Sequence, residues 1–132
     1  MTLHESSHDV VTVIASGILV DEALKAYEQL DAEDIPVRVI DMFTWKPLDE
    51  ELVLRAAAQT GAIVTAENHN VVNALGAAVS QLLAKNHPTI QEFVGAQERF
   101  GQVGPQNFLM DEYGMRAADI VAAAKKTISR KA

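Results

Sequence analysis

The chain contains no cysteine and no long hydrophobic run, and each absence excludes a class of protein. Without cysteine there can be neither a disulfide framework nor a thiolate metal site, which is compatible with the cytosol. No apolar run approaches the roughly 20 residues of a membrane-spanning helix, and the first residues lack the basic start and apolar core of a signal peptide. We therefore expect a soluble, cytoplasmic protein with no membrane partner.

Basic and aromatic residues are also scarce. The chain has 11 Lys and Arg against 18 Asp and Glu, a formal net charge of -7, and only 5% aromatic residues. No basic stripe interleaved with aromatics is present, so nucleic acid is not an expected partner. None of the four histidines stands three or four residues from another within a predicted helix, so no zinc site is expected.

The amino acids that are present are those of a globular domain. Of the 132 residues, 48% are hydrophobic and 22% are charged, with seven glycines, four prolines and no repeat or low-complexity tract. This length supports one hydrophobic core but hardly two. We expect a single domain spanning residues 1–132.

Short apolar runs alternate with amphipathic segments along the chain. The run Val10–Ala15 is typical of a strand covered on both faces, and residues 18–34 have the periodicity of a helix. Further strands are predicted at 37–42, 62–66 and 89–94, the last at a half-exposed sheet edge, with helices at 49–59, 71–86, 105–113 and 117–130. This alternation predicts an α/β fold with a largely parallel sheet.

The predicted helix 71–86 contains an interior glycine, Gly76. Glycine inside a helix costs about 1 kcal/mol relative to alanine, so some compensation is expected. Close approach of the helix to the sheet would supply it.

In such a sheet, ligands and partners meet the loops that follow the carboxyl ends of the strands. Those loops follow Ala15, Asp41 and Ala66. The candidate residues for a strand-end crevice or interface are Ser16, Gly17, Asp41, Trp45, Glu67, Asn68, His69 and Arg99.

The polar segment Glu67–Asn70, expected to be a loop, admits two interpretations. Glu67 and His69 could form an acid/base pair, because a carboxylate beside an imidazole tunes its pKa. Alternatively, Glu67 and Asn68 bond the backbone N–H groups of the next helix, while His69 packs against a neighbouring loop or partner chain. No nucleophile, metal-ligand spacing or phosphate loop accompanies the pair, which favours the second interpretation.

Two further segments have weaker functional signals. Ser16-Gly17-Ile18 could cradle a phosphate, but it lacks a Gly-rich phosphate pattern, which favours a plain strand-to-helix turn. The apolar cluster of Met42, Phe43 and Trp45 could cover the core, or form a protein-contact surface, which is favoured for Trp45.

Arg99 could bind a phosphate or pair with Glu98 or Asp111. A lone arginine does not make a phosphate site, because exposed arginines commonly pair with nearby carboxylates. The ion pair is therefore the favoured interpretation.

Several segments together resemble a known family. Val10–Gly17, Val37–Met42 with Lys46–Asp49, and Ile63–His69 are similar to the C-terminal domain shared by transketolase, 1-deoxyxylulose-phosphate synthase and the β subunits of 2-oxo acid dehydrogenases. The segment Arg99–Gly104, followed by Tyr113-Gly114-Met115 and Asp119–Val121, resembles transketolase in particular, above all the separately encoded short transketolases of bacteria and archaea. The resemblance covers nearly the whole chain.

The resemblance implies a three-layer α/β/α fold with a five-stranded, mostly parallel sheet. Its first strand would be antiparallel and supplied by Thr2–Glu5, so that edge is expected to be short or missing. Family members transfer a two-carbon ketol unit between sugar phosphates with thiamine diphosphate and a divalent cation such as Mg²⁺, both held by two other domains. We therefore expect no catalytic, cofactor-binding or metal-binding residue here, but an assembly domain, inactive alone, whose partners are other transketolase domains or subunits in a homo-oligomeric enzyme.

The sequence departs from the family pattern at two helix starts. Arg116 stands where Thr or Ser often caps the last helix, so its first turn is expected to lack an acceptor and fray. Asn73-Ala74 replaces a common glycine pair, which argues against close approach of a ligand. Two alternatives stay open: an independent regulatory or small-molecule-binding domain using Ser16, Asp41 and Glu67, or the same domain in the synthase or dehydrogenase branch.

Overall fold

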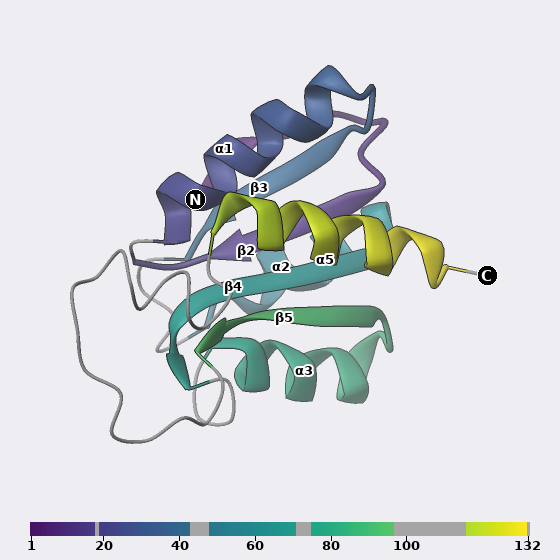
Figure 1. Cartoon of the computed structure of the whole chain (residues 1–132). Coiled ribbons are helices and arrows are strands. Elements are labelled where there is room, and N and C mark those ends of the chain that lie inside the picture. Colours follow the sequence, from purple (N-terminus) through teal and green to yellow (C-terminus); the bar gives the residue numbers. More distant parts are fainter. Residues whose placement is uncertain (18, 43–47, 71–74, 97–115, 132) are drawn as a thin grey trace.

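The computed structural model describes residues 1–17, 19–42, 48–70, 75–96 and 116–131 (Figure 1). From residue 11 onward the described strands and helices alternate, as the sequence pattern predicts. The predicted helix 105–113 lies outside the described residues. In chain order the elements are β1 (Thr2–His4), β2 (Val11–Ala15), α1 (Leu19–Ala32), β3 (Val37–Asp41), α2 (Glu50–Thr60), β4 (Ala62–Asn70), α3 (Leu75–Asn86), β5 (Ile90–Ala96) and α5 (Ala117–Ser129).

The five strands form one mixed sheet in the order β1-β3-β2-β4-β5. All neighbouring strands are parallel except β1 and β3, which pair antiparallel with Thr2 opposite Ile40. The N-terminal amine of Met1 extends this pairing by donating a 2.8 Å hydrogen bond to the carbonyl of Asp41. The antiparallel first strand is therefore present, although it is only three residues long.

Helices cover both faces of the sheet, which gives three layers. Val11 and Val13 of β2 face the core that α1 and α5 close, whereas Ile14 faces the core that α2 and α3 close. All five residues of β2 are buried, as expected for a strand covered on both faces. Figure 1 shows α5 in front of β2 and β4, with α2 behind the sheet.

Local sequence signals fix both ends of α2. The Oδ1 atom of Asp49 accepts a 3.2 Å hydrogen bond from the N–H of Leu52, as an N-cap should. Gly61 ends the helix with φ of 74°, and its N–H donates to the carbonyl of Ala57 at 2.9 Å. Helix α2 therefore begins and ends where the sequence predicts.

Helix α3 lies close to the sheet at Gly76. A Cβ atom built on Gly76 would lie 2.5 Å from Cδ2 of Phe93 and 3.0 Å from Oγ1 of Thr65. The predicted compensation for an interior glycine is thus confirmed, because no larger residue fits between α3 and the sheet without movement.

The predicted loop at Glu67–Asn70 is wrong, because these residues continue β4. After an irregularity that follows Ala66, Asn70 lies opposite Ala96 of β5. The longer β5 supplies backbone partners, so strand pairing overrides the polar character of the segment. Figure 1 shows this end of β4 bending away from β2. We call Glu67–Asn70 together with Gly95-Ala96 the β4–β5 extension.

Among the helices of the described ranges, none is both long enough and apolar enough to cross a membrane.

Candidate functional site

The carboxyl edge of the sheet brings three predicted residues together. In the strand register Ala15 lies opposite both Asp41 and Ala66. The N–H of Ser16 then donates to the carbonyl of Ala66 at 3.0 Å. Ser16 and Asp41 therefore lie at the carboxyl ends of β2 and β3, whereas Glu67 follows the last β4 residue that pairs with β2 and lies inside the longer β4.

Glu67 is buried, with 1% of its surface exposed, and its carboxylate caps α3. Oε1 accepts a 2.8 Å hydrogen bond from the N–H of Leu75, and Oε2 accepts a 2.6 Å bond from the N–H of Gly76. These backbone donors are the groups that bind anions at helix starts in related folds. Glu67 therefore fills this anion position itself, and the capping interpretation of Glu67 is confirmed.

Ser16 and Gly17 form a tight strand-to-helix turn. Gly17 has φ of 60°, a left-handed conformation that glycine adopts without steric cost. The carbonyls of Ser16 and Gly17 accept hydrogen bonds of 3.2 Å from the N–H groups of Leu19 and Val20. These donors are thus already engaged by the backbone, which supports the plain turn over a phosphate cradle.

Oδ1 of Asp41 is buried and has no hydrogen-bond partner. Among the carboxylate oxygens of the described residues, it is the only one in this state. The backbone of Asp41, in contrast, is fully hydrogen-bonded. Its N–H donates to the carbonyl of Met1 at 2.8 Å, and its carbonyl accepts from the amine of Met1. An unpartnered buried oxygen is costly, so this atom is the strongest indication of an unfilled polar contact at the carboxyl edge.

The remaining predicted residues are placed only in part. Asn68 and His69 belong to the β4–β5 extension. Trp45 and Arg99 lie outside the described residues. Over the described ranges, no three His, Cys, Asp or Glu residues are grouped so that they could hold a metal ion.

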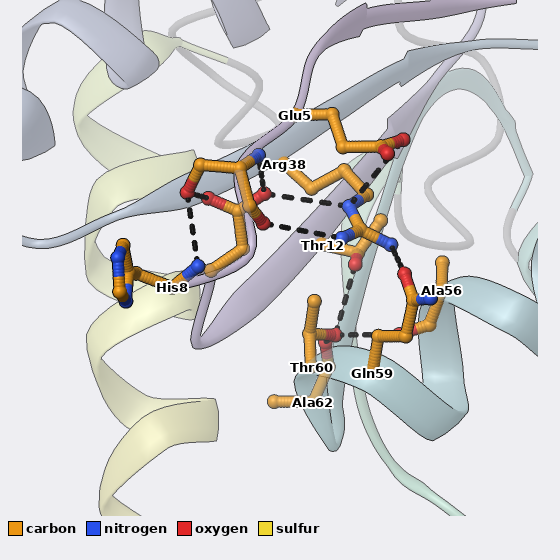
Figure 2. Close-up of polar contacts among 10 residues, drawn as sticks. Glu5, His8, Thr12, Arg38, Ala56, Gln59, Thr60 and Ala62 are labelled. Atoms are coloured by element: carbon orange, nitrogen blue, oxygen red, sulfur yellow. Dashed lines mark hydrogen bonds and ion pairs between the residues drawn. The ribbon is translucent and has the colours of Figure 1, made fainter.

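A buried polar network occupies the opposite, amino edge of the sheet (Figure 2). Arg38 of β3 is 3% exposed, and its Nε donates to Oδ2 of Asp9 at 3.3 Å. Its Nη1 donates to Oε1 of Gln59 at 2.6 Å, and its Nη2 donates to the carbonyl of Ser6 at 3.3 Å. The guanidinium thus ties the segment between β1 and β2 to β3 and to the end of α2.

Further polar groups surround the guanidinium of Arg38. Asp9, 7% exposed, also accepts from the N–H and Oγ of Ser6 at 2.7 and 2.8 Å. Glu5 adds a second carboxylate at 4.0 Å from Nε of Arg38. A pocket of about 490 Å³ opens beside them, lined by Glu5, Ser6, Ser7, Arg38 and Gln59. Because two carboxylates face one guanidinium, the pocket has an excess of negative charge and does not suit an anion. We therefore assign the network a structural role and no ligand.

A third buried carboxylate, that of Glu22, joins α1 to α5. Oε1 of Glu22, a residue 5% exposed, accepts a 2.9 Å hydrogen bond from the N–H of Ala117, and Oε2 accepts one from Lys25 at 3.0 Å. Burial alone would raise the pKa of Glu22, but the hydrogen bonds from Lys25 and Ala117 and the positive charges of Lys25 and Arg116 outweigh it and lower the pKa.

The prediction that α5 begins without an acceptor is wrong. The side chain of Arg116 makes no cap hydrogen bond, as expected. However, Oδ2 of Asp119 accepts from the N–H of Arg116 at 2.9 Å, and Glu22 accepts from the next N–H. The acceptors come from within the helix and from a residue 95 positions away, so the cap position alone could not reveal them.

Residues 2–120 match the family model described as "Transketolase, C-terminal domain". The chain belongs to this family. The matched region includes every described strand and the start of α5, so the transketolase C-terminal domain fold accounts for the architecture in Figure 1.

Relatives support the assignment over most of the chain. It is 45% identical over 121 residues to the 6-deoxy-6-sulfo-D-fructose transketolase subunit SqwH of Clostridium sp. (strain MSTE9), which covers 92% of this chain and 38% of that protein. It is 39% identical over 125 residues to 1-deoxy-D-xylulose-5-phosphate synthase 1 of Geobacter sulfurreducens, covering 93% of this chain and 20% of that protein.

A solved structure agrees with both the sequence and the fold. The structure titled "Split gene transketolase, inactive beta4 tetramer" superposes with a TM-score of 0.88 at 43% identity, covering 95% of this chain and 41% of that chain. The chain thus spans between 20% and 41% of the length of these relatives.

The amino-edge network is the part of this transketolase domain that sequence reasoning missed. Arg38 stands inside an apolar run predicted to be buried, and a charge there requires buried partners, which was the available signal. Asp9 and Gln59 lie 29 and 21 positions away, so no local pattern identifies them as those partners.

Proposed function

We propose that this chain is the assembly domain of a thiamine diphosphate-dependent transketolase, an enzyme that moves a two-carbon ketol unit between sugar phosphates. The domain binds other transketolase domains or subunits and copies of itself, and transfers nothing alone. The observation that carries this proposal is the state of Glu67. As the acidic residue at the predicted site, it is buried and each of its carboxylate oxygens accepts a hydrogen bond from a backbone N–H group, so it is engaged in capping α3.

The described residues do not fit thiamine diphosphate or its divalent cation. A diphosphate needs free N–H donors or cations, but the donors at the start of α3 are taken by Glu67. A hard cation needs several oxygen ligands, and no group of three candidate ligands exists in the described part of the chain. We therefore assign both groups to the other domains of the full enzyme and derive no chemical step here.

Self-association is supported by a relative. The split-gene transketolase at 43% identity is described by its title as an inactive β4 tetramer, so a chain that contains this domain assembles with itself. We extend that property to the present chain, with the domain contributing to the contact.

Reconstitution tests the proposal. Transketolase domains that hold thiamine diphosphate are mixed with and without this chain, and ketol transfer is followed with a sugar phosphate donor and with the 6-deoxy-6-sulfo sugar named for the clostridial relative. We expect turnover only in the mixture. Full activity without this chain would overturn the proposal, whereas formation of 1-deoxyxylulose phosphate instead of ketol transfer would move the chain to the synthase branch.

The unpartnered oxygen of Asp41 favours one other candidate, a regulatory domain that binds a small molecule at the carboxyl edge. A ligand hydroxyl or amine would satisfy that oxygen, whereas a phosphate would compete with Glu67 for the start of α3. Titration calorimetry with nucleotides and sugar phosphates decides between the two. Saturable binding to the chain alone, lost in Asp41→Ala, supports the regulatory function.

A further inference from the structure

The first strand, β1, adds little to the two hydrophobic cores. No side chain of residues 1–8 is buried, and the first buried residue of the chain is Asp9. Leu3 packs against the core that α1 and α5 close, but only partly buried. Beneath β1, Val39 and Ile40 of β3 are fully buried in cores that the helices close. Loss of β1 would therefore uncover mainly the backbone edge of β3.

The pairing of β1 with β3 is short and irregular. The strand has three residues, and its register shifts between Thr2 and His4. Such an irregularity disrupts the ladder of hydrogen bonds locally. At the carboxyl edge the pairing continues as two 2.8 Å hydrogen bonds between the backbones of Met1 and Asp41. Few backbone bonds thus hold this strand on the sheet.

A ring contact fastens the other end of β1. The imidazole of His4 stacks on the ring of Tyr27 of α1, with 3.8 Å between the ring centroids and an angle of 10° between the planes. A stacked pair of this kind is a modest contact compared with a buried ion pair.

The segment after Glu5 is held much more firmly, by the network around Arg38 (Figure 2). The carboxylate of Asp9 and the guanidinium of Arg38 are both buried and form an ion pair at 3.3 Å. Arg38 also donates to the carbonyl of Ser6, and Asp9 accepts from its N–H. The side chain of Glu5, in contrast, is 46% exposed and lies 4.0 Å from the guanidinium. Attachment therefore changes from weak to strong at Glu5.

We propose that residues 1–5 form a strap that opens as one unit while the rest of the sheet and the Arg38 network stay folded. Local openings of this kind occur where few apolar contacts hold a segment. Opening frees both backbone groups of Asp41 and leaves the edge of β3 able to pair with another strand. The strap is a property of the chain itself and does not depend on the enzymatic assignment.

Hydrogen exchange of two adjacent amides, followed by NMR at increasing urea concentrations, tests the strap. The N–H of Asp41 donates to the carbonyl of Met1, whereas the N–H of Met42 donates to the carbonyl of Ala15 in β2. Opening exposes only the first, so its protection factor should be at least about tenfold lower and nearly independent of urea. Equal protection with the same urea dependence would overturn the proposal.

The variant His4→Ala separates a strap from simple fraying of the chain end. If residues 1–5 open together, loss of the stack on Tyr27 should lower the protection of the Asp41 amide about two- to tenfold and leave Met42 unchanged. If Met1 only frays from the end, the Asp41 amide ignores the substitution, which overturns the strap. An equal fall at both amides overturns it as well, because β1 then opens only with the whole domain.

The matched control is His8→Ala, a second histidine of the same segment. His8 is exposed, and its contact in the network is a backbone one, from its N–H to Oγ of Ser6 at 3.2 Å. The substitution keeps that contact and should change the protection of neither amide. A fall at Asp41 as large as that in His4→Ala would contradict the assigned role of the ring contact.

Discussion

The carboxylate of Glu22 accepts a hydrogen bond from the backbone N–H of Ala117, 95 positions further along the chain, at 2.9 Å. This contact fixes the first turn of α5 on α1. Replacing Glu22 by alanine should therefore lower the free energy of unfolding by about 1 to 3 kcal/mol at neutral pH, because a buried N–H loses its acceptor. Urea denaturation measures the loss. Lys25→Ala removes only the partly exposed ion pair and should change stability little.

The same contact gives stability a pH dependence. The pKa of Glu22 is lower in the folded chain than its ordinary value of 4.5, so the folded state favours the charged carboxylate. The contribution is present above the unfolded pKa and is lost as pH falls below it through the folded pKa. The stability difference between the parent chain and Glu22→Gln should therefore shrink as pH falls from 4.5. A difference that stays constant over this interval would contradict the assignment.

Arg38 should be among the residues least tolerant of substitution. Arg38→Ala leaves the buried carboxylate of Asp9 without its ion-pair partner, which typically costs about 3 to 5 kcal/mol. Arg55→Ala, at an exposed position of α2, should cost less than about 0.5 kcal/mol. Urea midpoints compare the two. Equal midpoints for both variants would show that the network contributes nothing.

Gly76 offers a test of close packing that runs against helix propensity. Alanine normally stabilises a helix relative to glycine by about 1 kcal/mol. Here Gly76→Ala should instead destabilise the chain by about 1 to 3 kcal/mol, because the new methyl group collides with Phe93. The double variant Gly76→Ala with Phe93→Ala should cost less than the sum of the single variants. If thermal melts show that the stability losses of the two single variants simply add in the double variant, the contact between residue 76 and Phe93 is ruled out.

Glu67 should act on stability and not on turnover. Glu67→Ala leaves the N–H groups of Leu75 and Gly76 without acceptors, so stability should fall by about 2 to 6 kcal/mol, twice the cost of one unsatisfied buried donor. Glu67→Gln keeps one acceptor and should lose less. In the reconstituted enzyme, turnover per assembled complex should be unchanged for Glu67→Gln. A large fall in that quantity would restore the acid/base interpretation.

His69, in the β4–β5 extension, is predicted to serve assembly. His69→Ala should weaken binding to the other transketolase domains more than it lowers turnover of the complex once formed. Binding is followed by sedimentation and turnover at saturating chain concentration. Lower turnover with unchanged binding would overturn this role.

The sequence predicted the fold well because its signals are local. Apolar runs, the cap at Asp49 and the glycine at Gly61 each act within a few residues and define the elements they border. The parallel register explains why Ser16, Asp41 and Glu67 come next to or at the last pairs that β2 makes with β3 and β4, although β4 itself continues to Asn70. Prediction failed where partners are distant.

Two errors show this limit in physical terms. The polar segment Glu67–Asn70 looked like a loop, yet β5 supplies backbone partners as far as Ala96. Arg116 looked uncapped, yet Glu22 reaches the start of α5 from another helix. The strand pairing and the Glu22 contact join segments far apart in sequence, which no local pattern contains. The second acceptor at α5, Asp119, in contrast lies three residues from Arg116 and was a local signal that the prediction overlooked.

The Arg38 network has a consequence for the order in which the chain acquires its structure. During synthesis, Thr2–Asp9 leaves the ribosome before its distant partners: Ile40 opposite Thr2, the guanidinium of Arg38, and Gln59 beyond it. Only the contacts between Ser6 and Asp9 can form before β3 and α2 have emerged. The first strand of the sheet to be synthesised is in this way among the last to be secured.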